Sequence, residues 1–305
     1  MAGSCTRPGT TGRRQESTVA QENPFVDAHV HFWDRSRLTY PWLEEAGDAL
    51  PARFLPEDLD ALDAVAEAVV FVQADCVPEQ GVAEAAWAAE LVRARGGRGG
   101  VVAFAPVEDA AALPGAVDAL RAIDGVVGVR RLLQDEPEDL IRSDALAAGL
   151  RGLAAAGLTF DACVRHHQLD ALLALRRAAP DAAIVLDHLG KPPVREGWGA
   201  PAAKRWHAAI RALAAEPGTT VKLSGLAPEA GPGPVAAQVR PFLEAALEAF
   251  GADRCMAGSD FPVSAAPADA PSYGAWFDLV AELAGSPAEQ DAVLAGTARR
   301  VYGLG

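Results

Sequence analysis

The sequence predicts a single-domain α/β protein that folds as a (β/α)8 (TIM) barrel. Eight short apolar runs alternate with alanine-rich helical segments along the 305 residues. The runs are rich in Val, Ile and Phe without strict polar alternation, which is typical of parallel strands buried on both faces. An open doubly wound sheet is the structural alternative, but no GxGxxG motif follows the first run, so a dinucleotide-binding fold gains no support.

The strands are predicted, in chain order, over residues 25–32, 68–75, 100–106, 126–132, 159–164, 182–188, 219–224 and 255–260. Between them, helical patterns are clearest over residues 82–95, 144–156 and 168–179. Ser143 is placed to cap the second of these helices. The segment Ser286-Pro287-Ala288-Glu289 has the pattern of a capping box, and it predicts a last helix that reaches about Tyr302.

The barrel is expected to span residues 24–305, because residues 1–23 are rich in Ser, Thr, Gly, Gln and Arg and predict a disordered tail. Arg13-Arg14 is not followed by an apolar segment, so a twin-arginine export signal is not expected. No apolar run reaches the roughly 18 residues of a membrane span. We therefore expect a cytoplasmic protein.

The net charge of the chain limits the kinds of partner that it can bind, and the positions of its cysteines bear on disulfide bonding. The formal net charge of −14 argues against nucleic acid or an anionic membrane, since both would repel the chain. The four cysteines are scattered without CxxC spacing and indicate no disulfide framework. We expect a small-molecule substrate and, as an open possibility, a homodimer.

Four residues at predicted strand ends form the candidate catalytic set. In a barrel, the carboxyl ends of the strands and the loops after them make the active face. His29 and His31 are two residues apart on one strand, so their imidazoles point the same way. His188 ends the sixth predicted strand and Asp260 the eighth. A carboxylate buried at such a position is costly unless it is paired, metal-bound or catalytic.

Two mechanisms fit these four residues. A divalent metal such as Zn²⁺ or Mn²⁺ could bind His29, His31, His188 and Asp260, and would lower the pKa of a bound water toward about 7. Asp260 would then take a proton from that water as general base. Alternatively, Asp260 activates water without metal while the histidines polarise a carbonyl group. The sequence leaves both mechanisms open.

Four further residues at strand ends are expected to bind the substrate. They are Gln73 in the second strand, Arg130 in the fourth, Lys222 in the seventh and Trp33 after the first. Arg130 would contact the substrate or a developing oxyanion. A register shift of one residue would bring Arg131 to the pocket instead, so the choice between the two arginines stays open. For Lys222 the alternative is an ion pair with a neighbouring acid.

The ordered set of motifs resembles the amidohydrolase superfamily, in the amidohydrolase-2 branch that contains sugar-lactone lactonases. The resemblance runs from about Phe25 to Leu304 and is carried by Val26-Asp27-Ala28-His29-Val30-His31-Phe32-Trp33-Asp34, Tyr40-Pro41-Trp42-Leu43, Gly128-Val129-Arg130-Arg131-Leu132-Leu133-Gln134-Asp135-Glu136-Pro137, Leu186-Asp187-His188-Leu189-Gly190-Lys191-Pro192, Val221-Lys222-Leu223-Ser224-Gly225, Met256-Ala257-Gly258-Ser259-Asp260-Phe261-Pro262 and Ala298-Arg299-Arg300-Val301-Tyr302-Gly303-Leu304.

The resemblance implies a barrel hydrolase that opens a lactone to a hydroxy acid, with L-rhamnono- or L-fucono-type lactones as the substrate class. It also implies that His29, His31, His188 and Asp260 occupy active-site positions, and that a divalent metal is used by some members and not by others. One departure concerns the substrate. The loop 228–234 has no aromatic residue, whereas relatives often carry Trp there.

Two other functions are weighed against the lactonase. A non-oxidative decarboxylase of an aromatic acid would use the same metal positions, with Arg130 holding the carboxylate. A catalytically silent binding protein is the third possibility, and the intact set of three histidines and Asp260 argues against it.

Overall fold

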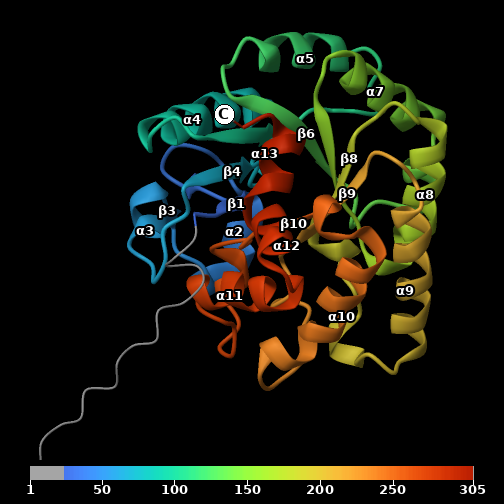
Figure 1. Cartoon of the computed structure of the whole chain (residues 1–305). Helices are drawn as coiled ribbons and strands as arrows, with labels where there is room; N and C mark the ends of the chain where they lie inside the picture. The colour runs from blue at the N-terminus through green and yellow to red at the C-terminus, as the bar shows by residue number, and fades with distance from the viewer. Residues whose placement is uncertain (1–23, 305) are drawn as a thin grey trace, which may run out of the picture.

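A computed structural model describes residues 24–304, and within them eight parallel strands form one sheet in the order β1-β4-β5-β6-β7-β8-β9-β10 (Figure 1). The predicted disordered tail, residues 1–23, lies outside the described residues. The barrel strands are β1 (Val26–Val30), β4 (Ala68–Val72), β5 (Gly99–Ala103), β6 (Val126–Leu132), β7 (Thr159–Cys163), β8 (Ile184–Leu186), β9 (Thr219–Leu223) and β10 (Cys255–Ala257).

The barrel closes where the first and last strands meet. The backbone N–H of His31 donates to the carbonyl of Phe261 at 2.9 Å, and that of Asp260 donates to the carbonyl of His29 at 2.7 Å. A parallel bridge also joins Val30 to Phe261. Closure satisfies the edges of a sheet that would otherwise be exposed. The fold is therefore the predicted (β/α)8 barrel.

Helices alternate with the strands and surround the sheet (Figure 1). Their bounds are α2 (Pro41–Ala46), α3 (Pro56–Asp60), α4 (Gly81–Ala94), α5 (Leu113–Arg121), α6 (Glu138–Ile141), α7 (Asp144–Ala155), α8 (Leu169–Ala178), α9 (Pro201–Ala214), α10 (Val235–Phe250), α11 (Tyr273–Ala284), α12 (Pro287–Asp291) and α13 (Thr297–Tyr302). None of the helices within residues 24–304 is long and apolar enough to cross a membrane.

Both predicted helix caps are confirmed. The hydroxyl of Ser143 accepts the N–H of Leu146 at the start of α7, and Ser286 forms a reciprocal capping box with Glu289 at the start of α12. The predicted last helix is made of three consecutive pieces, because a π-helical turn (η8, Ala292–Gly296) separates α12 from α13. The short antiparallel pair β2 (Trp33–Asp34) and β3 (Arg53–Phe54), between the first two barrel strands, was not predicted from the sequence.

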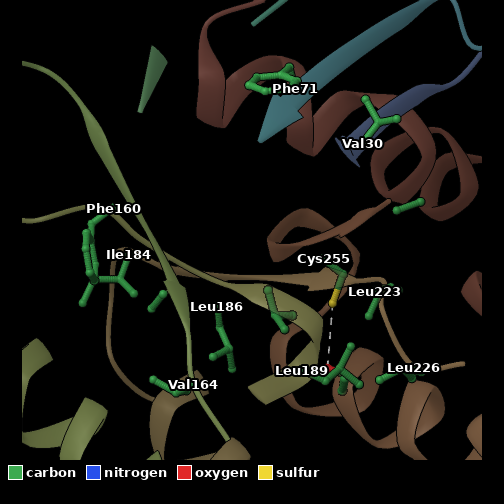
Figure 2. Close-up of a cluster of buried hydrophobic side chains, with 14 of the residues drawn as sticks. Val30, Phe71, Phe160, Val164, Ile184, Leu186, Leu189, Leu223, Leu226 and Cys255 are labelled. Carbon is green, nitrogen blue, oxygen red and sulfur yellow. Dashed lines mark hydrogen bonds between the residues drawn. The ribbon is translucent and has the colours of Figure 1, made fainter. Parts of the chain in front are cut away.

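Alternating side chains divide the core into two layers. Phe160, Ile184, Leu186, Leu223 and Cys255 belong to the large cluster between the barrel and its helices (Figure 2). The intervening residues point into the barrel, as successive side chains of a strand must. The inner layer contains the buried residues Val26, Val70, Val102, Val185 and Met256.

The amino-terminal end of the barrel is closed by the last helix. Tyr302 of α13 joins the inner apolar layer, and its hydroxyl donates to Asp161 of β7 at 2.7 Å. The helix lies against β1 and β10 (Figure 1). The carboxyl ends of the strands, by contrast, carry the polar residues described below.

Two glycines in α7 should respond in opposite ways to substitution by alanine. A Cβ at Gly149 would lie 1.9 Å from the backbone oxygen of Val107, whereas one at Gly152 would meet only Leu113 Cδ2 at an ordinary 3.7 Å. We expect Gly152→Ala to stabilise the fold by about 0.5–1 kcal/mol through helix propensity. Gly149→Ala should destabilise it by about 1–3 kcal/mol because backbone must move. Urea unfolding of both variants checks the prediction, and equal effects would contradict it.

Candidate active site

The two histidines of β1 reach the inside of the barrel through an irregularity in the strand. Asp27 pairs with Val69 and Val30 with Phe71, so β1 carries one more residue than β4 over this stretch, as in a β-bulge. His29 and His31 therefore share a face, with their Nε2 atoms 3.2 Å apart. The bulge is held by the buried carboxylate of Asp27, which accepts the backbone N–H of His29 and, at 2.8 Å, that of Ser259.

His188 is aimed into the mouth of the barrel by left-handed backbone. His188, Leu189, Gly190 and Lys191 all have φ between 48° and 67°, so β8 ends before the predicted residue 188. A side chain at Gly225 would collide with the imidazole of His188, since a Cβ there would lie 2.1 Å from its Nδ1. Glycine at this position therefore makes room for the ring.

Asp260 lies at the point where the three imidazoles converge. Its Oδ1 is 3.3 Å from His31 Nε2, 3.6 Å from His29 Nε2 and 3.7 Å from His188 Nε2. The second oxygen, Oδ2, accepts a hydrogen bond from the hydroxyl of Ser264 at 2.8 Å. Asp260 adopts φ +58°, a conformation that is uncommon for residues other than glycine. The surrounding contacts hold this carboxylate in one orientation.

These residues can hold a divalent cation. Ligand atoms of His29, His188 and Asp260 all lie within 4.8 Å of one another. The Nδ1 of His31 lies 2.8 Å from the carbonyl oxygen of Val72, which can only accept a hydrogen bond, so Nδ1 must donate. In the neutral ring the lone pair is then on Nε2, which faces Asp260 and the other rings. Three imidazoles and one carboxylate are a donor set that zinc prefers.

The charges of the cluster suit this role. Burial lowers the pKa of His188 to about 4. Burial and the neighbouring Lys222 ammonium hold the pKa of His29 well below its ordinary value. Both rings are therefore neutral at pH 7 and offer lone pairs. Burial alone would raise the pKa of Asp260, but the neighbouring imidazoles of His188 and His31 outweigh it and lower the pKa, so the carboxylate is ionised.

A buried ion cluster supports His29 from inside the barrel. The ammonium of Lys222 lies 2.6 Å from Asp161 Oδ2, 3.1 Å from Asp187 Oδ1 and 3.2 Å from His29 Nδ1. All four side chains are fully buried. Lys222 therefore does not lie where it was predicted to bind substrate. It forms the buried ion pair that was the alternative. The signal missed in the sequence was Asp161, a carboxylate at an inward position of β7.

The tautomer of His29 depends on this cluster. Its Nδ1 lies 3.3 Å from Asp187 Oδ1, a possible acceptor, and 3.2 Å from the Lys222 ammonium, a possible donor. A proton on Nδ1 that points to Asp187 leaves the Nε2 lone pair free for a metal. A hydrogen bond from Lys222 to Nδ1 instead moves the proton to Nε2. The side chains around His29 can thus serve either mechanism.

A pocket of about 310 Å³ opens above this cluster. His31, His188 and Asp260 form part of its floor, and Arg130 lines it beside them. The open choice between the arginines is thereby settled, because Arg131 points away from the pocket and pairs with Glu108 at 2.9 Å and Glu136 at 2.6 Å. The remaining polar and aromatic lining residues are Trp42, Asp75, Gln134, Asp135, Lys191 and Glu229.

Two residues expected at the substrate lie elsewhere. Trp33 is completely buried, and its indole N–H donates to the carbonyl of Pro51 at 2.8 Å, so it packs the β2–β3 pair instead of facing the pocket. Gln73 is also buried, and its side-chain oxygen accepts the N–H of Asp75 at 2.6 Å. Both expectations are corrected: alternation along a strand predicts the face of a side chain but not its depth in the barrel.

The pocket contains residues that the sequence analysis did not assign to it. Trp42, Asp75 and Glu229 line it without having been named as substrate-binding candidates, although Glu229 lies in the loop 228–234 that the resemblance relates to the substrate. All three stand in loops or short helices after barrel strands, a location that could have marked them. Their residue types alone carried no distinguishing pattern.

Comparison with known proteins identifies the family. The model of the Amidohydrolase family matches residues 26–304. The chain belongs to this amidohydrolase family. Its members are typically metal-dependent hydrolases, which agrees with the convergent donor set.

Individual relatives agree with this assignment. The amidohydrolase is 34% identical to an L-fucono-1,5-lactonase of Burkholderia ambifaria, over 82% of this chain and 84% of the relative. It is also 34% identical to an L-fucono-1,5-lactonase of Burkholderia multivorans, over 92% and 96% of the two chains. A crystal structure of a B. multivorans amidohydrolase with bound zinc superposes with a TM-score of 0.80 at 32% identity, covering 93% and 100%. A 2,6-dihydroxybenzoate decarboxylase from Rhizobium shares the fold at 16% identity (TM-score 0.59, 92% and 98% covered).

Glu84 of α4 should make stability depend on pH. Its buried Oε1 accepts the N–H of Ala74 at the pocket wall. Burial raises its pKa to about 7 from the ordinary 4.5, so the folded protein holds the proton more tightly than the unfolded chain. This contribution to stability is complete below pH 4.5 and is lost as the pH rises through 7, by about 3 kcal/mol in all.

Glu84→Gln should therefore gain stability over the wild type between pH 5 and pH 8, as measured by urea unfolding at both pH values. Glu90→Gln, at an exposed position of the same helix, is the matched control. Parallel pH profiles for the wild type and Glu84→Gln would contradict the assignment.

Asp187→Asn should weaken zinc binding. In the tautomer that leaves Nε2 free for a metal, Asp187 is the acceptor for the proton on His29 Nδ1. Replacing it disturbs both this tautomer and the orientation of the ring, and losses of about 10- to 100-fold in metal affinity are typical of such changes. Competition with a chelating dye measures the dissociation constant directly, without an activity assay. Asp135→Asn is the control, since Asp135 lines the pocket but pairs with Arg165. An unchanged affinity in Asp187→Asn would refute the role of Asp187.

Proposed function

We propose that the protein is a lactonase, a carboxylic ester hydrolase that opens an aldono-1,5-lactone of the L-fucono type to its hydroxy acid. The observation that carries the proposal is the convergence of three imidazole Nε2 atoms within 3.3–3.7 Å of one carboxylate oxygen of Asp260, at the floor of a pocket of about 310 Å³. The two L-fucono-1,5-lactonases among the relatives support the substrate class.

We assign the metal to His29, His31, His188 and Asp260, with zinc or manganese as candidates. A divalent ion held by these four side chains would polarise the lactone carbonyl and lower the pKa of water. The chain supplies the remaining chemistry. Asp260 accepts a proton from the attacking water, while Ser264 holds its other oxygen and so keeps Oδ1 turned to the pocket.

The reaction then balances as an ester hydrolysis. Water oxygen bonds to the carbonyl carbon, and the guanidinium of Arg130, at the pocket wall, stabilises the negative charge that develops on the carbonyl oxygen. The bond from carbon to the ring oxygen breaks, and the ring oxygen leaves as a hydroxyl group with a proton. The products are a carboxylate and a hydroxyl on one open chain, with one proton released to solvent.

A decarboxylase is less well supported by the same pocket. Such an enzyme must bind an anionic aromatic acid. Arg130 and Lys191 line the pocket, but so do Asp75 and Glu229, whose carboxylates have no charged partner among the described residues and would repel such a ligand. A neutral lactone is not repelled in this way. Action as a homodimer in the cytoplasm stays a prediction from the sequence.

The proposal is tested by acid release. Purified, zinc-loaded protein should open L-fucono-1,5-lactone, followed with a pH indicator, and dialysis against a chelator should reduce the rate. Asp260→Asn should lower kcat by at least about 100-fold, because a general base is lost. Turnover of Asp260→Asn at the wild-type rate would overturn the mechanism. Release of carbon dioxide from aromatic acids without any lactone opening would favour the decarboxylase.

A further inference from the structure

We propose that Asp75, beside the ring of Trp42, recognises the ring hydroxyls of the substrate and makes this pocket selective for polyhydroxylated, uncharged lactones. The inference rests on the proposed lactonase function and deepens it. No role in chemistry is assigned to Asp75; it determines which lactone is accepted.

The carboxylate of Asp75 is free to bind a ligand. Asp75 is exposed to solvent yet lines the same pocket as His31, His188 and Asp260. Among residues 24–304, no side-chain nitrogen lies within ion-pair distance of its oxygens and no hydrogen-bond donor reaches them. An unpaired carboxylate accepts strongly from hydroxyl groups, and these bonds are stronger than those between neutral groups.

The backbone around Asp75 is fixed from several sides. Asp75 adopts φ +59°, and its N–H donates to the side chain of Gln73. The preceding residue, Ala74, donates its N–H to Glu84 at 3.1 Å and accepts the indole N–H of Trp42 at 2.8 Å. A recognition group held in this way loses little conformational freedom when it binds. The buried side chains of Gln73 and Glu84 therefore serve to hold the backbone at Ala74 and Asp75 in place.

Trp42 adds an apolar surface next to this acceptor. Its ring lines the pocket and is held edge-on to Trp33 at 5.5 Å. Because the indole N–H is already bonded to Ala74, only the aromatic ring remains available to a substrate. A ring that packs against C–H groups, beside a carboxylate that accepts from hydroxyls, suits a molecule that carries both, as a sugar lactone does.

A second free carboxylate lies in the loop where an aromatic residue was expected. Glu229 lines the pocket from the segment after β9, and no side-chain partner for its carboxylate occurs among the described residues. With Asp75 after β4, hydroxyl acceptors stand in two separate loops of the pocket. Lys191 also lines the pocket, but its ammonium donates to Gln134, so the two unpaired carboxylates still disfavour a lactone that carries its own carboxylate.

The test compares two six-membered lactones that differ only in ring substituents. An aldono-1,5-lactone carries hydroxyls, and δ-valerolactone carries none. Asp75→Asn keeps the shape, and Asn tolerates a left-handed φ, so the loop should stay folded, as thermal unfolding would confirm. Glu79→Gln, on the exposed turn that follows, is the charge-matched control outside the pocket.

We expect the wild type to prefer the aldonolactone in kcat/KM. Asp75→Asn should lower kcat/KM for the aldonolactone by about 10- to 100-fold, the usual effect of losing hydrogen bonds to a charged group. The value for δ-valerolactone should change by less than about 3-fold, and Glu79→Gln should leave both values unchanged.

Other outcomes separate the two proposals. Equal losses on both lactones, or no loss on either, would overturn the role of Asp75 while the lactonase stands. A wild type that opens both lactones equally well would overturn it whatever the variant does. A wild type that opens neither lactone would refute the lactonase, and the inference with it.

Discussion

The active site depends on the ion cluster that Lys222 forms inside the barrel. Its ammonium joins Asp161 of β7 to Asp187, which follows β8, and reaches His29 of β1. Removing one partner of such a buried pair costs about 3–5 kcal/mol, since it leaves an uncompensated charge. The position of His29, and through it the spacing of His31 and Asp260, therefore rests on groups that never touch the pocket.

The interior of the barrel is layered, with apolar side chains at one end and charged and polar side chains at the other. Apolar side chains fill its amino-terminal half, the Lys222 cluster lies above them, and the imidazoles with Asp260 lie above the cluster. Burial keeps His29 and His188 neutral, whereas the pKa of Asp260 is lowered despite its burial, so that carboxylate is ionised. Neutral rings beside an ionised carboxylate are what both metal binding and base catalysis need. The protonation states follow from depth in the barrel.

Much of the fold and the centre of the site could be predicted from the sequence. Eight apolar runs predicted the strands, and the two-residue spacing of His29 and His31 predicted their shared face. Strand alternation could not give the depth of a side chain, so Lys222 and Gln73 were placed too near the substrate. The bulge of β1 and the left-handed turn after β8 could not be predicted either, because neither leaves a repeating hydrophobic pattern in the sequence.

Residues of the pocket wall were harder to predict for a different reason. Asp75, Glu229 and Trp42 come from irregular segments or short helices whose path is set by contacts far away in the sequence, such as the bond from Trp42 to Ala74. Trp33 and Trp42 are equally plausible aromatic contacts by composition, and only the fold separates the buried one from the pocket residue.

The hydrogen bond from Tyr302 to Asp161 also joins the last helix to the middle of the barrel, so distant parts of the sequence complete the site together. The histidines of β1 leave the ribosome early, but the floor beneath them is completed by α13, and the barrel closes on residues 259–261. A nascent chain that lacks these last segments holds His29 and His31 without Asp260 and with an open barrel. The complete set of donor atoms therefore exists only after the segment around Asp260 has joined β1, so all four side chains could hold a divalent cation only in the closed barrel.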